Sequence, residues 1–586
     1  MWKKRAIAWL FICIFGFMLL LARLMQIQLF ETEAFSKHNV NLLEESVNQR
    51  TQEIVIDNGR GNFLDRNGEM LTYKKERVLV LFPFLKKMNW NAAKVAEIMG
   101  VSQSSIQATL GSSKKPFAYG EPEPIELTAS QMEEINALKI PGVFAVEQKF
   151  ERASIPAEQL IGLTGENPKE LAKRYPDKEL SEKTLIGVTG LEESFDEFLL
   201  PEGKSKLVYH VDGGGAPLFG INVKYIDPAN PFYPVNVRTT IDKTIQEKAE
   251  ELVEKYGIKK GGLVLLNIED NSIEALVSRP LINKNNPYNG IGMTNQIVNQ
   301  QIIGSVFKTV VAAAAIDQNL DSPGRMFDCS KKINGKPEHK YNYGMLTFSD
   351  SFARSCNQTF GELARELQKM NPQMLETYAE RLSLTGAVGW NGDIYHTSDF
   401  KQFPDEDKGR VFLSEEARKD ANFVAMSGIG QHEVRSTPLA VANMMATIAR
   451  GGKKEMVRAV SKIEFKNGTT MVPFPKKELS GDSISPYTAM KLQKLLREVV
   501  TNPNGTGRWF KDLPDEVAGK SGTAETGKYL DGKQLHNKWF AGYFPFQSPK
   551  YALVCFNLDV IEDEGGVNSL FADMVKMLHE KETGNF

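Results

Sequence analysis

The chain has 586 residues, which is too long for one hydrophobic core, so we expect about three folded units. Its composition is that of a globular protein, and a net charge of −2 gives no electrostatic reason to expect nucleic acid as a partner. The four cysteines are widely spaced and form no Cys-x-x-Cys pair, so we expect free thiols and no disulfide framework.

An uncharged apolar run occupies residues 6–22, between a basic cluster at residues 3–5 and Arg23. It is at the short end for a membrane helix and just longer than a typical signal-peptide core, and no small-residue cleavage site follows it. Basic residues beside a span stay in the cytoplasm. We therefore expect residues 1–23 to be a cytoplasmic tip and an uncleaved anchor in the cell membrane, with the bulk of the chain outside. A cleaved signal peptide is the alternative.

Residues 24–235 mix helical and extended signals without an internal repeat. Residues 24–50 favour a helix that leaves the membrane, Asn67-Gly68 favours a hairpin turn, and the glycine-rich stretch 203–215 favours a loop. We interpret the whole region as a non-catalytic pedestal domain.

Residues 236–586 show the pattern of an α+β domain. A helix is expected over 239–256 with Asp242 as its cap, and a hairpin is expected to turn at Glu269-Asp270-Asn271. Near the C-terminus three strands and a helix are expected over 517–526, 539–546, 551–558 and 566–580. We expect the first and last strands to pair in one antiparallel sheet, with helices on both faces and a helical lobe.

Ser305 and Lys308 begin an apolar run, residues 305–316, which predicts a buried central helix. Three residues apart on a helix, the two side chains lie on one face. The N–H groups at a helix start can stabilise an oxyanion, and a lysine in apolar surroundings can be neutral enough to accept the serine proton. Alone the pattern is weak, because Ser-x-x-Lys also begins at Ser112 and Ser398. Taken by itself, it is better explained by a capping serine beside a snorkelling lysine.

Ser355-Cys356-Asn357 follows an expected helix over 346–354. The Ser355 hydroxyl can donate and accept, so it can pass a proton to a leaving amine, and the Asn357 amide can bind a peptide bond. A Ser/Asn turn with only local hydrogen bonds is an equal alternative for this motif alone. Another Ser-x-Asn begins at Ser46.

Lys520-Ser521-Gly522-Thr523 lies on an expected strand. Lys520 and the two hydroxyls can bind a substrate carboxylate, and glycine within a strand marks a close approach by a ligand or another backbone. The free strand edge could pair with a peptide, and the Thr523 N–H could complete an oxyanion hole. The alternative is an exposed edge strand protected by a lysine. Only the set that begins at Ser305 has all three motifs in catalytic order.

With these residues, the chain resembles the penicillin-binding proteins, in particular the monofunctional class B D,D-transpeptidases. Further segments resemble family landmarks: Arg60-Gly61-x-x-Leu64-Asp65-Arg66-Asn67-Gly68 and Gly187–Asp196 in the pedestal, Thr240-Ile241-Asp242-x-x-Ile245-Gln246 at the start of the catalytic domain, Ser427-Gly428-Ile429-Gly430-Gln431 leading to Thr437-Pro438-Leu439, and Trp539-Phe540-Ala541-Gly542-Tyr543.

The resemblance implies that Ser305 attacks the penultimate D-Ala carbonyl of a peptidoglycan stem pentapeptide and releases the terminal D-Ala. Lys308 is then the general base, Ser355 the proton relay and Asn357 the residue that orients the acyl chain. The segment from Lys520 to Thr523 holds the terminal carboxylate. An amine from a neighbouring stem peptide resolves the acyl-enzyme, and β-lactams acylate the same serine.

The resemblance implies no metal and no organic cofactor, and it implies a glycosyltransferase and other wall-synthesis proteins as partners. The chain departs from the family at Ile303, where proline is usual, at Ser521, where threonine is commoner, and at His432, where glycine often stands. These departures concern substrate fit and β-lactam affinity. Three alternatives remain: a membrane-anchored β-lactamase, a D,D-carboxypeptidase, and a weakly catalytic scaffold or β-lactam sensor.

Overall fold

The structure is a computed structural model that describes residues 2–32, 35, 41–42, 50–178, 180–212, 224–395 and 397–584. The chain folds into two compact units, of which the first comprises residues 1–60, 73–151 and 201–231 and the second comprises 61–72, 152–200 and 232–586. Ser46, most of the expected helix over 24–50 and the end of the glycine-rich stretch lie outside the described residues.

The N-terminal apolar run forms helix α1 (Trp2–Met25), which continues into the short π-helical segment η1 (Gln26–Phe30). None of the α1 side chains is buried. In the described part of the chain, residues 2–30 form the one helix that is long and apolar enough to cross a membrane. By length and composition this helix fits either a membrane anchor or a signal sequence.

Among its described residues from 50 onward, the first unit contains small antiparallel sheets and short helices that pack around one core. Strand order is β4-β3-β5 in one sheet and β1-β8-β9 in the other. The elements are β1 (Thr51–Asp57), β3 (Tyr73–Leu81), η2 (Pro83–Lys87), α3 (Ala92–Met99), α4 (Gln103–Ser112), β4 (Phe117–Ala118), α5 (Ala129–Ala137), β5 (Val143–Glu151), β8 (Ser205–His210) and β9 (Lys224–Ile226).

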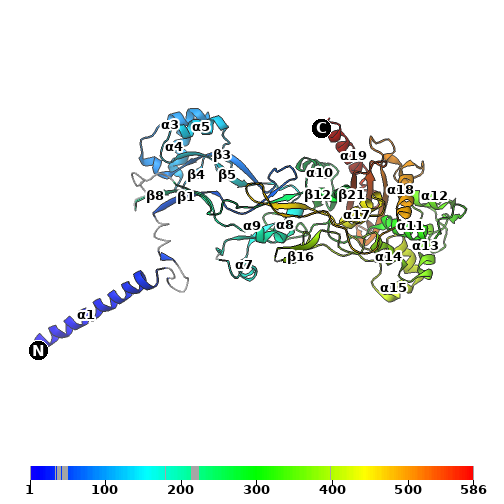
Figure 1. The fold of residues 1–586 in the computed structure, drawn as a ribbon, viewed down its shortest axis with the longest axis horizontal. Helices are drawn as coiled ribbons and strands as arrows, with labels where there is room; N and C mark the ends of the chain where they lie inside the picture. Colours follow the sequence, from blue (N-terminus) through cyan, green and yellow to red (C-terminus); the bar gives the residue numbers. More distant parts are fainter. Residues whose placement is uncertain are drawn as a thin grey trace. The chain divides into compact units, whose positions relative to one another are not determined.

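A five-stranded antiparallel sheet organises the second unit, with strand order β12-β11-β21-β20-β19. Strands β12 and β21 of this sheet are labelled in Figure 1. Its strands are β11 (Gly261–Asn267), β12 (Ser272–Arg279), β19 (Ala518–Leu530), β20 (Lys533–Phe544) and β21 (Tyr551–Ile561). The N-terminal strand β11 pairs with the C-terminal strand β21 along its whole length, from Gly261↔Asn557 to Asn267↔Tyr551. The expected pairing of the first and last strands is therefore confirmed.

Helices cover both faces of this sheet. Successive strand residues point to opposite sides, and both sides carry apolar side chains that must be buried. Leu263 and Leu265 pack in a core with α10 (Lys243–Lys255) and α19 (Asn568–Glu582). Val264 and Leu266 belong to a second core with α11 (Lys308–Asp317) and α17 (Pro438–Ala449). The sheet with its two helical layers confirms the predicted α+β fold. Asp242 caps α10 as expected, since its carboxylate accepts from the Ile245 N–H.

A group of helices surrounds α11 on the second face: α12 (Phe348–Ala353), α13 (Asn357–Met370), α14 (Met374–Arg381), α16 (Ala421–Gly428) and α18 (Pro486–Thr501). The remaining elements of this unit are β2 (Asn62–Leu64), α6 (Glu158–Ile161), β6 (Thr164–Glu166), α7 (Pro168–Arg174), β7 (Leu185–Gly187), α8 (Gly190–Ser194), α9 (Asp196–Leu199), β10 (Asn236–Thr239), η3 (Gly304–Phe307), β13 (Phe327–Asp328), β14 (Met345–Leu346), β15 (Asn391–Ile394), β16 (Thr397–Lys401), α15 (Glu415–Lys419), β17 (Val460–Glu464), β18 (Thr470–Pro473) and η4 (Arg508–Phe510).

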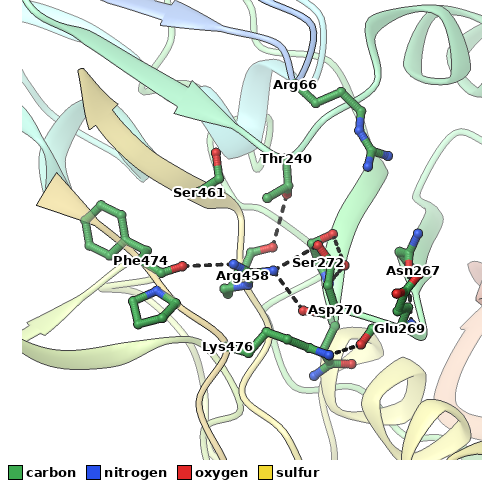
Figure 2. A network of polar contacts seen from close by, with 12 residues as sticks. Arg66, Thr240, Asn267, Glu269, Asp270, Ser272, Arg458, Ser461, Phe474 and Lys476 are labelled. Atoms are coloured by element: carbon green, nitrogen blue, oxygen red, sulfur yellow. Dashed lines mark hydrogen bonds and ion pairs between the residues drawn. The ribbon is translucent and has the colours of Figure 1, made fainter. Parts of the chain in front are cut away.

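The turn between β11 and β12 is held by a buried arginine (Figure 2). Arg458 donates from Nη2 to the carbonyl and carboxylate oxygens of Asp270, at 3.0 and 2.9 Å, and from Nη1 to the Phe474 carbonyl at 2.9 Å. Lys476 donates to the Glu269 carbonyl in the same turn. Hydrogen bonds to a charged donor are stronger than neutral ones, so this network stabilises the expected hairpin at its tip.

Candidate active site

Ser305 lies in the 3₁₀ turn η3, immediately before the buried helix α11. The nine residues from Lys308 to Ile316 are all buried, which agrees with a helix that is apolar nearly all round. Ser305 is the second residue of η3. The first N–H groups of a helix have no acceptor within that helix, so the Ser305 N–H can bind a substrate oxygen. Its side chain is partly exposed, whereas Ile303 before it is fully buried.

Lys308 is fully buried and its ammonium contacts the second motif. Nζ lies 2.7 Å from the Ser355 carbonyl, 3.0 Å from Ser355 Oγ and 2.7 Å from Asn357 Oδ1. Burial lowers the pKa of Lys308 well below the usual lysine value, and the positive charge of Lys520 lowers it further. The neutral amine has two N–H donors for the two oxygens at 2.7 Å, which leaves its lone pair available as a base.

In the described chain no hydrogen bond joins Ser305 Oγ to Lys308 Nζ. The two residues are nevertheless three apart where η3 runs into α11, which places their side chains on one face. Catalytic hydrogen bonds are often long before substrate binds. The geometry is therefore compatible with a nucleophile and its base at the start of one helix.

The second motif lies at the junction of two helices, where α12 has ended and α13 begins at Asn357. Ser355 adopts a left-handed backbone conformation with φ of 60°. Such a φ is costly for a residue other than glycine and persists where surrounding contacts maintain it. It directs both the carbonyl and the hydroxyl of Ser355 to Lys308.

A disulfide joins Cys356, the central residue of this motif, to Cys329, 27 residues earlier. The expectation of free thiols throughout the chain was therefore wrong, although Cys13 and Cys555 are free. Wide spacing in the sequence did not reveal the pair, because the bond depends on how the segment after β13 packs against α13. The available signal was the expected location outside the membrane, because disulfides form in oxidising compartments.

Lys520 lies on β19, an edge strand of the sheet, and is fully buried. Its Nζ donates to Ser355 Oγ at 3.0 Å and to the Ser521 carbonyl at 3.2 Å. Burial lowers the pKa of Lys520 to about 7. The hydroxyl of Ser355 is thus shared by two buried lysines that come from the first and third motifs.

The rest of the third motif adjoins the start of α11. Ser521 Oγ donates to Thr506 Oγ1 at 2.9 Å, so Thr506 is a site residue that sequence reasoning missed. A Cβ at Gly522 would lie 2.8 Å from the Ile303 carbonyl, which explains why glycine occupies this position. Thr523 is exposed on the strand.

The structure thus brings Lys308, Ser355, Asn357 and Lys520 into direct contact, with Ser305 and Ser521 beside them. The other two Ser-x-x-Lys sequences lie in different settings. Ser112 ends α4 in the first unit and donates to the Thr109 carbonyl, and Ser398 lies in the short hairpin strand β16.

Two family models match this chain. Residues 261–571 match the model described as the penicillin binding protein transpeptidase domain. Residues 55–225 match the model of the penicillin-binding protein dimerisation domain. The first range contains all three motifs.

Curated relatives carry the same kind of description. The peptidoglycan D,D-transpeptidase PbpA of Mycobacterium tuberculosis is 27% identical over 354 residues, which cover 54% of this chain and 66% of that protein. The peptidoglycan D,D-transpeptidase MrdA of Haemophilus influenzae is 26% identical over 382 residues, which cover 58% of this chain and 55% of that protein. The matched part is less than two thirds of each relative's length, at 66% and 55%.

Solved structures show the same fold over most of the chain. One similar chain comes from the structure titled "Structural coordination of polymerization and crosslinking by a peptidoglycan synthase complex". Its TM-score is 0.64 at 21% identity, and the match covers 98% of this chain and 97% of that chain. Penicillin-binding protein 2B from Streptococcus pneumoniae has a TM-score of 0.58 at 18% identity, with 91% and 99% covered. The family predicted from the sequence is confirmed. Because the transpeptidase model alone spans more than half of it, this chain belongs to the penicillin-binding proteins, as a class B member that joins a dimerisation domain to a transpeptidase domain.

Proposed function

We propose that this chain is a peptidoglycan D,D-transpeptidase that acts through a covalent acyl-enzyme at Ser305. The observation that carries the proposal is the position of the Ser355 hydroxyl, which lies 3.0 Å from both Lys308 Nζ and Lys520 Nζ. One lysine follows the nucleophile by three residues and the other lies on the strand that faces it. The hydroxyl can therefore carry a proton between the base and the leaving group.

In the acylation step, Ser305 Oγ attacks the carbonyl carbon of the penultimate D-Ala of a stem pentapeptide. Lys308 in its neutral form accepts the hydroxyl proton as the new C–O bond forms. The C–N bond to the terminal D-Ala then breaks, and Ser355 passes a proton to the leaving amine. Lys520 in its charged form binds the terminal carboxylate together with the hydroxyls of Ser521 and Thr523.

In the second step, an amine of a neighbouring stem peptide attacks the acyl-enzyme carbonyl. The attacking amine gives up a proton to the neutral Lys308, the ester bond to Ser305 breaks, the Ser305 oxygen takes that proton back from Lys308, and a cross-linking amide forms. The Asn357 side chain orients the acyl chain, and the N–H groups of Ser305 and Thr523 stabilise the oxyanion in both steps. A β-lactam acylates the same serine, because its ring amide takes the place of the scissile bond.

We further propose that residues 2–30 are an uncleaved anchor in the cell membrane and that both folded units lie outside the cytoplasm. Lys3, Lys4 and Arg5 lie at the start of α1, directly before its apolar run at residues 6–22, and support a cytoplasmic N-terminus. The Cys329–Cys356 disulfide supports an oxidising compartment. A glycosyltransferase as working partner is supported by the structural similarity to a chain of a peptidoglycan synthase complex.

The proposal is tested by intact-mass measurement of the full-length protein after incubation with benzylpenicillin, followed by peptide mapping of the adduct. Wild-type protein and the control Ser398→Ala are expected to gain one stable penicilloyl group on Ser305. Ser305→Ala is expected to gain none and to keep the thermal unfolding midpoint of the wild type. An adduct that persists in Ser305→Ala would contradict the assignment of the nucleophile.

The same protein also separates the alternatives by their products. Rapid penicillin turnover without a stable adduct would indicate a β-lactamase. With a pentapeptide donor, the transpeptidase is expected to join the acyl group to an added amine. Release of D-Ala without amine incorporation would indicate a D,D-carboxypeptidase, and no reaction at all would favour a scaffold or sensor.

A further inference from the structure

The Ser427–Gln431 segment resembles a family landmark, but the proposed reaction gives it no task. In the structure its last two residues contact both backbone segments that carry the proposed oxyanion donors. The Gly430 carbonyl accepts from the Gly304 N–H at 3.1 Å, one residue before Ser305. The Gln431 carboxamide donates to the Thr523 carbonyl at 3.3 Å and accepts from the Glu525 N–H at 3.1 Å.

The bonds from Gln431 show which way Thr523 faces. In an antiparallel strand the N–H and C=O of one residue point to the same side, and alternate residues point to opposite sides. The Thr523 carbonyl and the Glu525 N–H both point to Gln431, away from β20. The Thr523 N–H therefore points to the same free edge, toward the start of η3. The carboxamide bonds to this edge as the N–H and C=O of one residue of an additional parallel strand would.

These segments pack so closely that a shift of one would displace the others. Gly304 and Gly430 both have positive φ, of 54° and 75°. A Cβ at Gly304 would lie 2.4 Å from the Thr523 carbonyl oxygen, and a Cβ at Gly430 would lie 1.8 Å from the Gly304 carbonyl oxygen. Main chain therefore packs directly on main chain from Gly430 through Gly304 to Thr523, without side chains between them.

We propose that Gln431 is a positioning residue of the oxyanion hole: together with Gly430, it joins the backbone before Ser305 to β19 and so holds the N–H groups of Ser305 and Thr523 at the separation that a tetrahedral intermediate requires. This inference rests on the proposed acyl-transfer function. Among the described residues, Gln431 makes no hydrogen bond to Ser305. Its carboxamide donates to the Thr523 carbonyl. This bond fixes β19 at the residue whose N–H is the proposed oxyanion donor.

The inference makes a kinetic prediction, because an oxyanion exists in the transition state and not in bound substrate. Removal of the carboxamide should slow acylation and leave substrate binding unchanged. Loss of a whole oxyanion donor costs roughly 100-fold to 1,000-fold in rate. Misplacement of a donor that is still present should cost less, about tenfold. The affinity of a boronic acid, which forms a tetrahedral adduct with the serine, should fall by a similar factor.

The experiment uses the full-length wild type and Gln431→Ala, with the acylation rate and the binding constant for benzylpenicillin measured separately, and with a boronic acid as the tetrahedral probe. We expect Gln431→Ala to lower the acylation rate and the boronate affinity about tenfold, with the binding constant for benzylpenicillin unchanged within about twofold. The control is Ser398→Ala. Ser398 lies in the hairpin strand β16, away from the site residues, so wild-type rates are expected.

A second variant tests the hydrogen bond itself. Gln431→Glu has the same shape, but its ionised carboxylate cannot donate to the Thr523 carbonyl. Its acylation rate relative to wild type should be low at pH 7 and should rise as the pH falls toward about 5, because a protonated carboxyl can donate again. A side chain that only supports the fold would not show this recovery.

The outcomes separate the inference from the function on which it rests. Wild-type protein that forms no adduct at Ser305 would overturn both. If the wild type is acylated and Gln431→Ala has the same acylation rate, the positioning role is wrong and the proposed function stands. Faster acylation by Gln431→Ala would also overturn the inference, since the carboxamide would then be blocking the strand edge. If the acylation rate of Gln431→Glu relative to wild type does not change with pH, the hydrogen bond to the Thr523 carbonyl is not the basis of the positioning role.

Discussion

At the residue scale, the chemistry depends on two buried lysines that need opposite charge states. Lys308 must be neutral to accept a proton, and Lys520 must be charged to bind a carboxylate. Both are fully buried, and burial disfavours the ammonium form of each. Lys308 also has the positive charge of Lys520 as a neighbour. Two cations that share one hydroxyl repel each other, so one of them loses its proton first, and we expect this to be Lys308.

This arrangement predicts the pH dependence of acylation. The pKa of Lys308 is lowered by its burial and by the charge of Lys520, so its neutral form, which acts as the base, is present at lower pH than for an ordinary lysine. Lys520 has a pKa of about 7 and loses its charge as the pH rises through that value. The second-order rate constant for benzylpenicillin, which reports on the free protein, should therefore fall as the pH increases from about 7 to 9.

The measurement is a pH profile of adduct formation for the wild type and Lys520→Arg. Arginine keeps its charge at all these pH values, so the decline on the alkaline side should disappear in this variant even if its absolute rate is lower. A wild-type profile that stays flat between pH 7 and 9 would show that Lys520 keeps its proton in the folded protein.

At the element scale, a disulfide ties the second motif to an earlier segment. It joins Cys329, which follows β13, to Cys356 at the start of α13. The disulfide from Cys329 to Cys356 closes a loop of 27 residues in sequence separation. Closing such a loop lowers the conformational entropy of the unfolded chain, which stabilises the folded state by about 3 kcal/mol in the chain-entropy account. The disulfide also lies next to Ser355, whose left-handed backbone conformation needs surrounding contacts to maintain it.

We therefore expect the paired variant Cys329→Ala/Cys356→Ala to unfold at a lower temperature than the wild type, with a loss of about 3 kcal/mol. Calorimetry measures the change. A reducing agent should lower the wild-type midpoint and leave that of the paired variant unchanged. The control is Cys555→Ala at a free, buried thiol, whose midpoint should still respond to the reducing agent. A paired variant as stable as the wild type would show that packing alone holds the motif.

At the scale of the whole molecule, the two compact units are built from interleaved segments. Residues 61–72 and 152–200 belong to the second unit although most of the chain around them belongs to the first. Contacts between distant segments define these units, whereas composition changes along the chain suggested one boundary near residue 235. The boundary between pedestal and catalytic domain at 235/236 remains a prediction.

The N-terminal helix leads to a prediction about the location of the chain. If residues 2–30 are an uncleaved anchor, protein expressed in a bacterium should remain in the membrane fraction after washes with high salt and alkaline carbonate and should need detergent for release. Intact mass should include the N-terminal segment. A chain without residues 2–30, directed outside by an unrelated cleavable signal, should be soluble and should still be acylated at Ser305. A mature protein that has lost the helix would identify it as a signal sequence.

The sequence alone determined the features that depend on local pattern and on order along the chain. Residues 305–316 are apolar nearly all round, so the helix had to be buried. Asp242 could be identified as a cap because aspartate favours that position and lies near the start of the helical pattern over 239–256, although the helix itself begins at Lys243. The three motifs in catalytic order, with helix, loop and strand around them, indicated the family before any contact was known.

Only the tertiary structure decided which distant groups meet at the site. Thr506 hydrogen-bonds Ser521, Gln431 hydrogen-bonds Thr523, and Cys356 is bonded to Cys329. None of these pairs follows from periodicity or spacing, because each depends on how loops pack on the sheet and on α13. The lowered pKa values of the two lysines have the same origin, since burial is a property of the folded chain and not of the motif.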